Sequence, residues 1–136
     1  MNPGMTIRVS SEQGRVPVTV FHVSGDIDGN TYEQFQVQAA QTAESGTHDL
    51  LIDLSQVGYV SSAGLRAIHY VFNLLRSNTP EESDEAMRKG LMDGSFKSPH
   101  LKLLNPNPAV TTSLKTAGFD MYLAIYHNLK EAVDSY

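Results

Sequence analysis

Apolar and polar positions change their period along the chain, and these changes predict alternating strands and helices. Residues 50–54 form an almost unbroken apolar run, too short for a helix and typical of a strand buried on both faces of a parallel sheet. From residue 65 onward the apolar positions are spaced by three or four, as on the buried side of a helix. These positions are Leu65, Ile68, Phe72 and Leu75.

Two strands and a helix are predicted before this central strand. Residues 6–10 and 16–23 alternate in polarity around Gln13-Gly14, which predicts a hairpin. Pro17 lacks a backbone N–H group, so its end of the second strand should lie at an edge or a bulge. Thr31 followed by Gln34 is a capping-box pattern, and it predicts a helix that runs to about Ser45-Gly46.

Two further strands and two helices are predicted after residue 98. Residues 100–105 continue the sheet, and Asn107-Pro108 opens a helix that ends at Gly118. Met121, Leu123 and Ile125 alternate as a last strand. Asn128 and Glu131 begin the final helix. Four of its residues are expected to close over the core: Leu129, Ala132, Val133 and Tyr136.

A long connection, residues 77–98, separates the second helix from the fourth strand. Its segment Thr79-Pro80-Glu81-Glu82 combines a cap, a first-turn proline and an early glutamate, which predicts a short helix ending near Gly90. Two interpretations stay open for this insertion. It is either a surface loop without a role of its own or a dedicated partner-binding element.

Strands that alternate with helices after residue 30 require parallel pairing through right-handed crossovers, with the hairpin added at one side of the sheet. The predicted fold class is therefore α/β, with a mixed sheet. A length of 136 residues corresponds to one domain, residues 1–136, which is large enough for a proper core.

Composition narrows the function classes. A formal charge of −5 provides no general attraction to nucleic acid or to anionic lipid, so neither is an expected partner. Without cysteine the chain has no disulfide and no thiolate metal site, which fits a reducing compartment. We find no signal peptide and no long apolar span, and we expect a cytoplasmic protein that does not insert into a membrane.

Ser61 and Ser62 stand at the predicted start of the helix that follows the central strand. Free backbone N–H groups and the positive end of the helix dipole meet there, so an oxygen or an added phosphate would be stabilised. A helix needs one capping hydroxyl, and we assign that role to Ser61. Ser62 is then left exposed on the first turn.

Several motifs along the chain, including the segment around Ser61 and Ser62, resemble those of the STAS domain. This is the family of bacterial anti-sigma factor antagonists and of sulphate-transporter C-termini. The resemblance covers most of the chain and is broken mainly at residues 77–98. The matching segments are residues 25–28 (Gly-Asp-Ile-Asp), 53–55 (Asp-Leu-Ser), 60–65 (Val-Ser-Ser-Ala-Gly-Leu), 101–105 (Leu-Lys-Leu-Leu-Asn) and 129–132 (Leu-Lys-Glu-Ala).

This resemblance implies a fold and a function. It implies about five strands in a mixed sheet with about four main helices, and a non-enzymatic protein that binds an anti-sigma factor serine kinase. Phosphorylation of Ser62 would switch binding off, and a PP2C-type phosphatase would restore it. Ser61 departs from the antagonists, in which that position is acidic. The residues expected to bind the partner are Asp26, Asp28, Ser61, Ser62, Ala63, Gly64 and Arg66.

Other roles for STAS proteins stay open. The chain could be a constitutively bound subunit, either a scaffold of a stress-sensing complex or an adaptor of a lipid-transporting ABC system. Enzymatic readings have less support, because Val60-Ser61-Ser62-Ala63-Gly64 lacks the first glycine of a nucleophile elbow. Asp53 closes the central strand as a receiver aspartate would, but Tyr126-His127 stands where a receiver domain has lysine.

No cofactor or metal is expected from the sequence. The simpler interpretation of Asp53 is a carboxylate that accepts N–H groups from the loop at residues 55–58. No glycine-rich phosphate loop occurs. The five histidines show no metal-ligand spacing and are interpreted as surface or strand-end residues: His22, His48, His69, His100 and His127.

Overall fold

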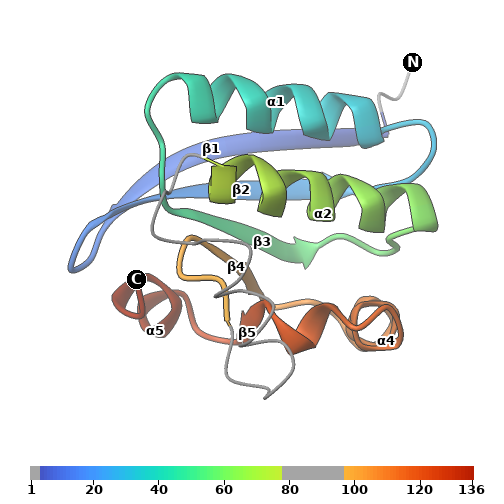
Figure 1. The fold of residues 1–136 in the computed structure, drawn as a ribbon. Coiled ribbons are helices and arrows are strands. Elements are labelled where there is room, and N and C mark those ends of the chain that lie inside the picture. The colour runs from blue at the N-terminus through green and yellow to red at the C-terminus, as the bar shows by residue number, and fades with distance from the viewer. Residues whose placement is uncertain (1–3, 78–96) are drawn as a thin grey trace.

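A computed structural model describes residues 4–77 and 97–136 and shows one five-stranded sheet with helices on both faces (Figure 1). The strands are β1 (Met5–Gln13), β2 (Pro17–Gly25), β3 (Leu50–Gln56), β4 (Leu101–Leu104) and β5 (Ala124–Tyr126). The helices are α1 (Tyr32–Glu44), α2 (Ser62–Ser77), α4 (Pro108–Thr116), α5 (Leu129–Asp134) and the 3-10 turn η1 (Phe119–Met121). The short helix predicted within residues 77–98 lies outside the described residues.

The strand order is β1-β2-β3-β4-β5, so sequence neighbours are also neighbours in the sheet. β1 and β2 are antiparallel, whereas β2 to β5 are parallel, which confirms the predicted mixed α/β sheet. Pro17 is the first residue of β2 and pairs with Gln13 at the hairpin end. Pairing to β3 begins only at Thr19, so the missing N–H group of Pro17 costs no bond of that ladder.

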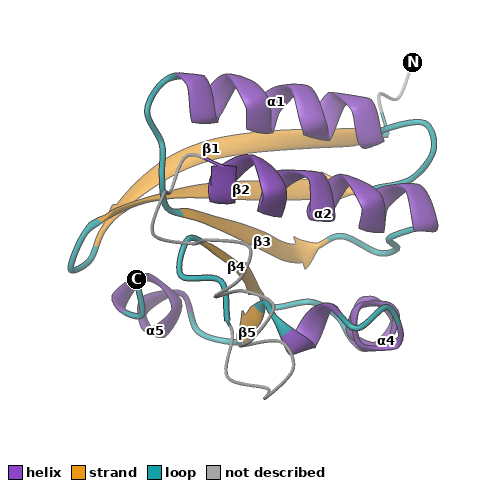
Figure 2. Cartoon of the chain, in the orientation of Figure 1, coloured by secondary structure: helices purple, strands orange, loops and turns teal. Residues whose placement is uncertain are grey.

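The larger core lies between the sheet and the helices α1, α2 and α4. Helices α1 and α2 run side by side over the same face of the sheet (Figures 1 and 2). Ile52 and Leu54 of β3 point into this core, where Phe21 and Phe35 meet edge to face with ring centroids 6.3 Å apart. Because Leu51 of β3 is fully buried on the other side, the prediction of a strand covered on both faces is confirmed.

A smaller core lies under α5 on the opposite face of the sheet. It consists of Val18, Val20, Leu51, Leu104, Ala132 and Val133. The Tyr136 hydroxyl donates to the Leu50 carbonyl at 2.5 Å. Leu129, predicted to cover the core, is instead 36% exposed, since a six-residue helix turns only one narrow side toward the sheet.

Two local predictions are wrong. The Thr31 side chain does not cap α1, because its hydroxyl donates to the Asp26 carbonyl and accepts from the Asp28 N–H. Gln34 donates to the Met5 carbonyl instead of closing a capping box. Met121 belongs to a 3-10 turn, and the last strand begins only at Ala124.

Three other predicted helix ends are confirmed. Asn107 accepts from the Val110 N–H at 2.7 Å, and Pro108 follows at the first helical position. Asn128 accepts from the Glu131 N–H at 3.0 Å. Gly118, just beyond α4, has a φ of 80°, a left-handed conformation that favours glycine.

Candidate functional site

The site predicted from sequence lies at the carboxyl end of β3, where the chain enters α2. Ser61 donates its N–H to the Ile27 carbonyl at 3.0 Å, and Ile27 donates its N–H to the Tyr59 carbonyl at 3.1 Å. Ile27 and Val60 thus form an isolated parallel bridge. These bonds place the β2–α1 turn, which carries Asp26 and Asp28, directly beside the start of α2.

Ser61 caps α2, as predicted. Its Oγ accepts the Gly64 N–H at 3.2 Å, and its carbonyl accepts the Leu65 N–H at 2.8 Å. Ser62 is the first residue of α2 and is exposed, whereas Ala63 is half-buried behind it. The cap therefore uses one hydroxyl and leaves the other, that of Ser62, at the surface.

Gly64 is required by close packing. A Cβ atom at this position would lie 2.2 Å from the Ile27 carbonyl oxygen and 2.8 Å from Cγ1 of Val60. The first turn of α2 therefore rests directly on the backbone of the β2–α1 turn. Gly64 is buried, and the structure assigns it a packing role rather than an accessible contact.

Asp26 and Asp28 differ in their surroundings. The Asp28 Oδ1 accepts from the Asn30 N–H at 2.9 Å and lies 3.3 Å from the Thr31 hydroxyl, so it stabilises its own turn. Asp26 is exposed, and its Oδ1 lies 3.3 Å from the point that a Cβ of Gly58 would occupy. Asp26 is therefore the more accessible carboxylate beside the start of α2.

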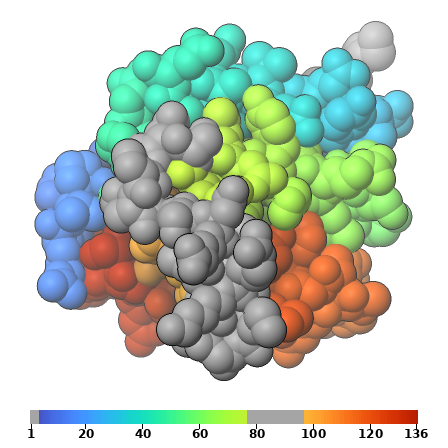
Figure 3. All heavy atoms as spheres, viewed as in Figure 1, coloured from blue at the N-terminus to red at the C-terminus, as the bar shows by residue number. Residues whose placement is uncertain are grey.

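Two shallow hollows flank Leu65 on the outer side of α2. One, of about 460 Å³, is walled by α2 and η1, and its lining includes Arg66 and Phe119. The other, of about 310 Å³, lies between the start of α2 and α4 and includes Ser62. The surfaces of α2 and of the residues around α4 share a border in Figure 3. Sequence reasoning missed both hollows, since their walls come from distant segments.

Asp53 has the structural role expected of it, with an additional partner. Its Oδ1 accepts the Ser55 N–H at 3.0 Å, and its Oδ2 lies 3.0 Å from Nδ1 of His22. Because a carboxylate only accepts, His22 donates from Nδ1. Burial alone would raise the pKa of Asp53, but the hydrogen bonds from Ser55 and His22 outweigh burial and hold the pKa below its usual value.

His22 extends this contact across three strands. Its Nε2 lies 2.8 Å from Oγ of Ser10, so Ser10, His22 and Asp53 form a row over β1, β2 and β3. The row has the residue types of a hydrolase triad. It runs across β1, β2 and β3 and does not lie at the start of α2, and we interpret it as a cross-strand link.

The interpretation of the histidines as surface or strand-end residues is wrong for His22, which lies half-buried in the middle of β2. Two other histidines also have side-chain partners. His100 lies 2.7 Å from Asp49 at the start of β3, and His69 shares a 3.0 Å hydrogen bond with the Tyr122 hydroxyl. Burial raises the pKa of Tyr122 to about 12. Within residues 4–77 and 97–136, no group of three or more histidine or acidic side chains could hold a metal ion.

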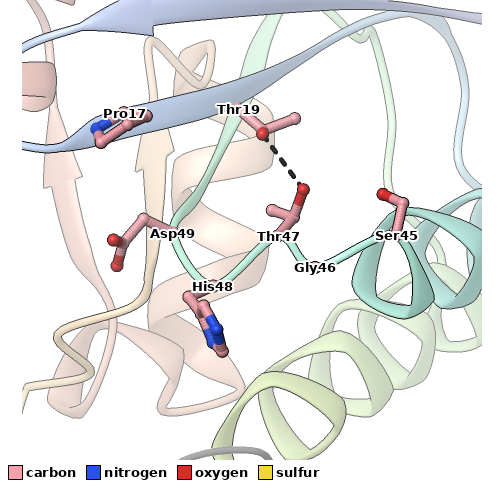
Figure 4. Close-up of a pocket in the computed structure, with 7 residues that line it drawn as sticks. All are labelled: Pro17, Thr19, Ser45, Gly46, Thr47, His48 and Asp49. Carbon is pink, nitrogen blue, oxygen red and sulfur yellow. Dashed lines mark hydrogen bonds between the residues drawn. The ribbon is translucent and has the colours of Figure 1, made fainter.

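A further hollow, of about 320 Å³, lies at the other end of β3 (Figure 4). The hydroxyls of Thr19 and Thr47, which both line it, share a hydrogen bond of 3.3 Å, while His48 and Asp49 point in different directions. Ser62 follows the carboxyl end of β3, so this hollow is separated from the predicted site by the length of the strand. It brings together no cluster of chemistry-bearing side chains.

Comparisons with known proteins identify the family of this chain. The family model of the STAS domain matches residues 10–81, more than half of the chain. The chain belongs to the STAS family. No curated protein sequence matches it.

Solved structures share the fold at low sequence identity. An anti-sigma factor antagonist from Mycobacterium paratuberculosis is 22% identical, with a TM-score of 0.70, over 98% of this chain and 94% of that one. A putative antagonist from Thermotoga maritima is 17% identical, with a TM-score of 0.71, over 94% and 92%. Phosphorylated SpoIIAA, a Bacillus cell fate determinant, is 13% identical, with a TM-score of 0.62, over 95% and 97%. These likenesses show a SpoIIAA-like STAS fold.

No helix in the described part of the chain combines the length and the apolar character needed to cross a membrane.

Proposed function

We propose that this protein is an anti-sigma factor antagonist that binds an anti-sigma factor serine kinase and is switched off by phosphorylation at Ser62. The observation that carries the proposal is that two neighbouring serines have different roles at the start of α2. Ser61 is occupied as the cap of α2, whereas the Ser62 hydroxyl is exposed on the first turn. One of the structures with the same fold is described as SpoIIAA in its phosphorylated form.

The proposed partner surface combines the start of α2 with the turn beside it. It comprises Asp26, Asp28, Ser61, Ser62, Ala63, Gly64 and Arg66. Gly64 would contribute by letting α2 approach the turn, since its own Cα is buried. The accessible contacts would come from Asp26, Ser62 and Arg66, which are exposed.

Phosphorylation would act on the complex more than on the fold. A phosphate on Ser62 adds about −1.5 to −2 charges at a helix N-terminus, which stabilises an anion by about 0.3–1 kcal/mol. A partner that packs on this turn must instead desolvate the dianion close to Asp26. Burying an unpaired charge costs several kcal/mol, so the penalty arises in the complex and lowers affinity by orders of magnitude.

The protein would thereby regulate sigma-factor-dependent transcription in the bacterial cytoplasm, with a PP2C-type phosphatase removing the phosphate. It acts by binding and carries out no reaction of its own. The second candidate is a STAS adaptor or scaffold subunit of a stress-sensing or lipid-transporting ABC assembly, in which binding is constitutive. The shared fold favours either role, and the exposed hydroxyl of Ser62 favours the first.

The decisive experiment offers the protein to the Ser/Thr kinases encoded near its gene and then measures binding. We expect one stoichiometric phosphate on Ser62, tight binding by Ser62→Ala, and at least tenfold weaker binding by Ser62→Asp. Both variants should keep the circular dichroism spectrum of the wild type. Ser61→Ala is the matched control. It loses the cap and about 1 kcal/mol of stability but keeps the phosphorylation site.

Two outcomes would contradict the proposal. Equal affinities of Ser62→Ala and Ser62→Asp for the anti-sigma protein would remove the electrostatic switch and favour the constitutive adaptor. Phosphate on another residue, with Ser62 unmodified, would remove the proposed site.

Arg66 provides a separate test of the partner surface. Its guanidinium can bind a carboxylate of the partner through two parallel hydrogen bonds. Because Arg66 is exposed, we expect Arg66→Glu to weaken partner binding at least tenfold without lowering the melting temperature. Unchanged affinity in a titration would place Arg66 outside the interface.

A further inference from the structure

Ser62 and Arg66 are four residues apart on α2, and both are exposed. Side chains at this spacing lie one above the other on a helix, with Cβ atoms about 5–6 Å apart. An acidic group placed N-terminal to a basic one is also the favoured order of such a pair. Ser62 and Arg66 line the two neighbouring hollows that flank Leu65 of α2.

Arg66 has no ion pair with a described residue, so its guanidinium is available. The charged residues of the two helices that flank the Ser62 hollow are all basic. Helices α2 and α4 contain Arg66, Arg76 and Lys115 but no aspartate or glutamate, in a chain whose formal charge is −5. The carboxylates that the structure places beside the start of α2 belong to Asp26 and Asp28 of the neighbouring turn.

We propose that Arg66 is the intramolecular counter-ion of phosphorylated Ser62, and that this pairing withdraws Arg66 from the partner. The inference rests on the proposed phosphorylation of Ser62. In the unphosphorylated protein, Arg66 lines the hollow between α2 and η1, where its guanidinium is open to a partner carboxylate. Once phosphate is present, the dianion one turn away competes for the same guanidinium.

The phosphate has the advantage in this competition. It carries up to two negative charges and three acceptor oxygens, and it is held on the same helix, whereas a partner carboxylate must be brought from solution. Phosphorylation would therefore act twice. It adds a charge that the partner must desolvate, and it removes the cation that the partner would have contacted.

The test uses the intact protein with phosphoserine genetically encoded at position 62, so that it needs neither kinase nor partner. The second pKa of the phosphate, about 6 for phosphoserine, is measured by phosphorus NMR. A paired guanidinium favours the dianion, so Arg66→Gln should raise this pKa by at least about 0.2 of a pH unit. Arg66→Lys should retain part of the effect, because it keeps the charge and loses the planar fork.

The matched control is Arg15→Gln, which removes the same type of charge from the β1–β2 hairpin. It should leave the phosphate pKa unchanged. An equal pKa in the wild type and in Arg66→Gln would overturn the capture of the phosphate by Arg66, as would an equal shift in Arg15→Gln. These results are independent of the proposed function, which fails separately if no kinase modifies Ser62 or if phosphorylation does not weaken partner binding.

Discussion

At the scale of single residues, Asp53 makes two hydrogen bonds, one that the sequence predicts and one that it does not. The bond from the Ser55 N–H was expected, because a carboxylate commonly accepts from a backbone group two residues later. The bond from His22 depends on the register between β2 and β3, in which His22 and Asp53 are direct partners. Two strands separated by a whole helix do not reveal their register in sequence.

The lowered pKa of Asp53 predicts a contribution to stability that depends on pH. A carboxyl whose pKa is lower in the folded protein stabilises the fold above its ordinary pKa of 3.8, and loses this effect as pH falls through the folded value. We expect Asp53→Asn to cost about 1 kcal/mol near neutral pH, and less below about pH 4. Urea unfolding at several pH values measures this difference. The exposed Asp134 provides the control variant, Asp134→Asn, and an Asp53→Asn cost that is independent of pH would contradict the assignment.

At the scale of elements, the helix ends show why local rules succeed or fail. Asn107 and Asn128 cap their helices as predicted, because each cap needs only a backbone N–H three residues away. Thr31 has the same local pattern, yet its hydroxyl binds the turn that carries Asp26 and Asp28. The 3-10 turn η1 was not predicted, and its residue Met121 was assigned to the last strand. Phe119 is buried in the large core, and the chain makes a short helical turn around it before the last strand begins.

The contact between α2 and the β2–α1 turn gives an element-scale prediction. A methyl group at residue 64 would lie 2.2 Å from the Ile27 carbonyl oxygen, so Gly64→Ala must push α2 away from the turn. We expect the free energy of unfolding to fall by about 1–3 kcal/mol. Gly29→Ala, in the same turn, is the control, because no atom lies within 4 Å of its added methyl group. Thermal unfolding of both variants measures the effect, and equal stabilities would show that the close approach does not constrain α2.

At the scale of the whole molecule, the order of elements determines which parts of the site could be predicted. Parallel strands joined through helices bring the start of α2 beside the β2–α1 turn, so the grouping of Ser62 with Asp26 follows from topology. The hollows beside Leu65 do not follow from it. Their walls combine side chains of α2, α4 and η1, and the packing of these elements depends on contacts that no single segment encodes.

A half-buried tyrosine packs against the core on each face of the sheet, and these two phenols predict how the protein responds to alkali. Tyr122 packs against Phe72 and Phe119 beside the large core, with the ring centroids of Tyr122 and Phe72 4.8 Å apart. Tyr136 packs on the small core and donates to the Leu50 carbonyl. Burial raises the pKa of Tyr122 to about 12 and raises that of Tyr136 as well, with Asp49 adding to the second shift.

A phenol whose pKa is raised by folding stabilises the protein fully below its ordinary pKa of 10.0, and this stabilisation is lost as pH rises above that value. The loss reaches up to about 1.4 kcal/mol per pH unit for Tyr136, whose pKa is raised further, and less for Tyr122. Lys102, whose pKa is lowered by burial, opposes the loss only up to its ordinary value of 10.5. We therefore expect stability to fall above about pH 10.5. Tyr136→Phe should flatten this fall more than Tyr122→Phe, as measured by urea unfolding between about pH 9 and pH 12. A wild-type slope retained in both variants would show that neither phenol stays protonated through folding.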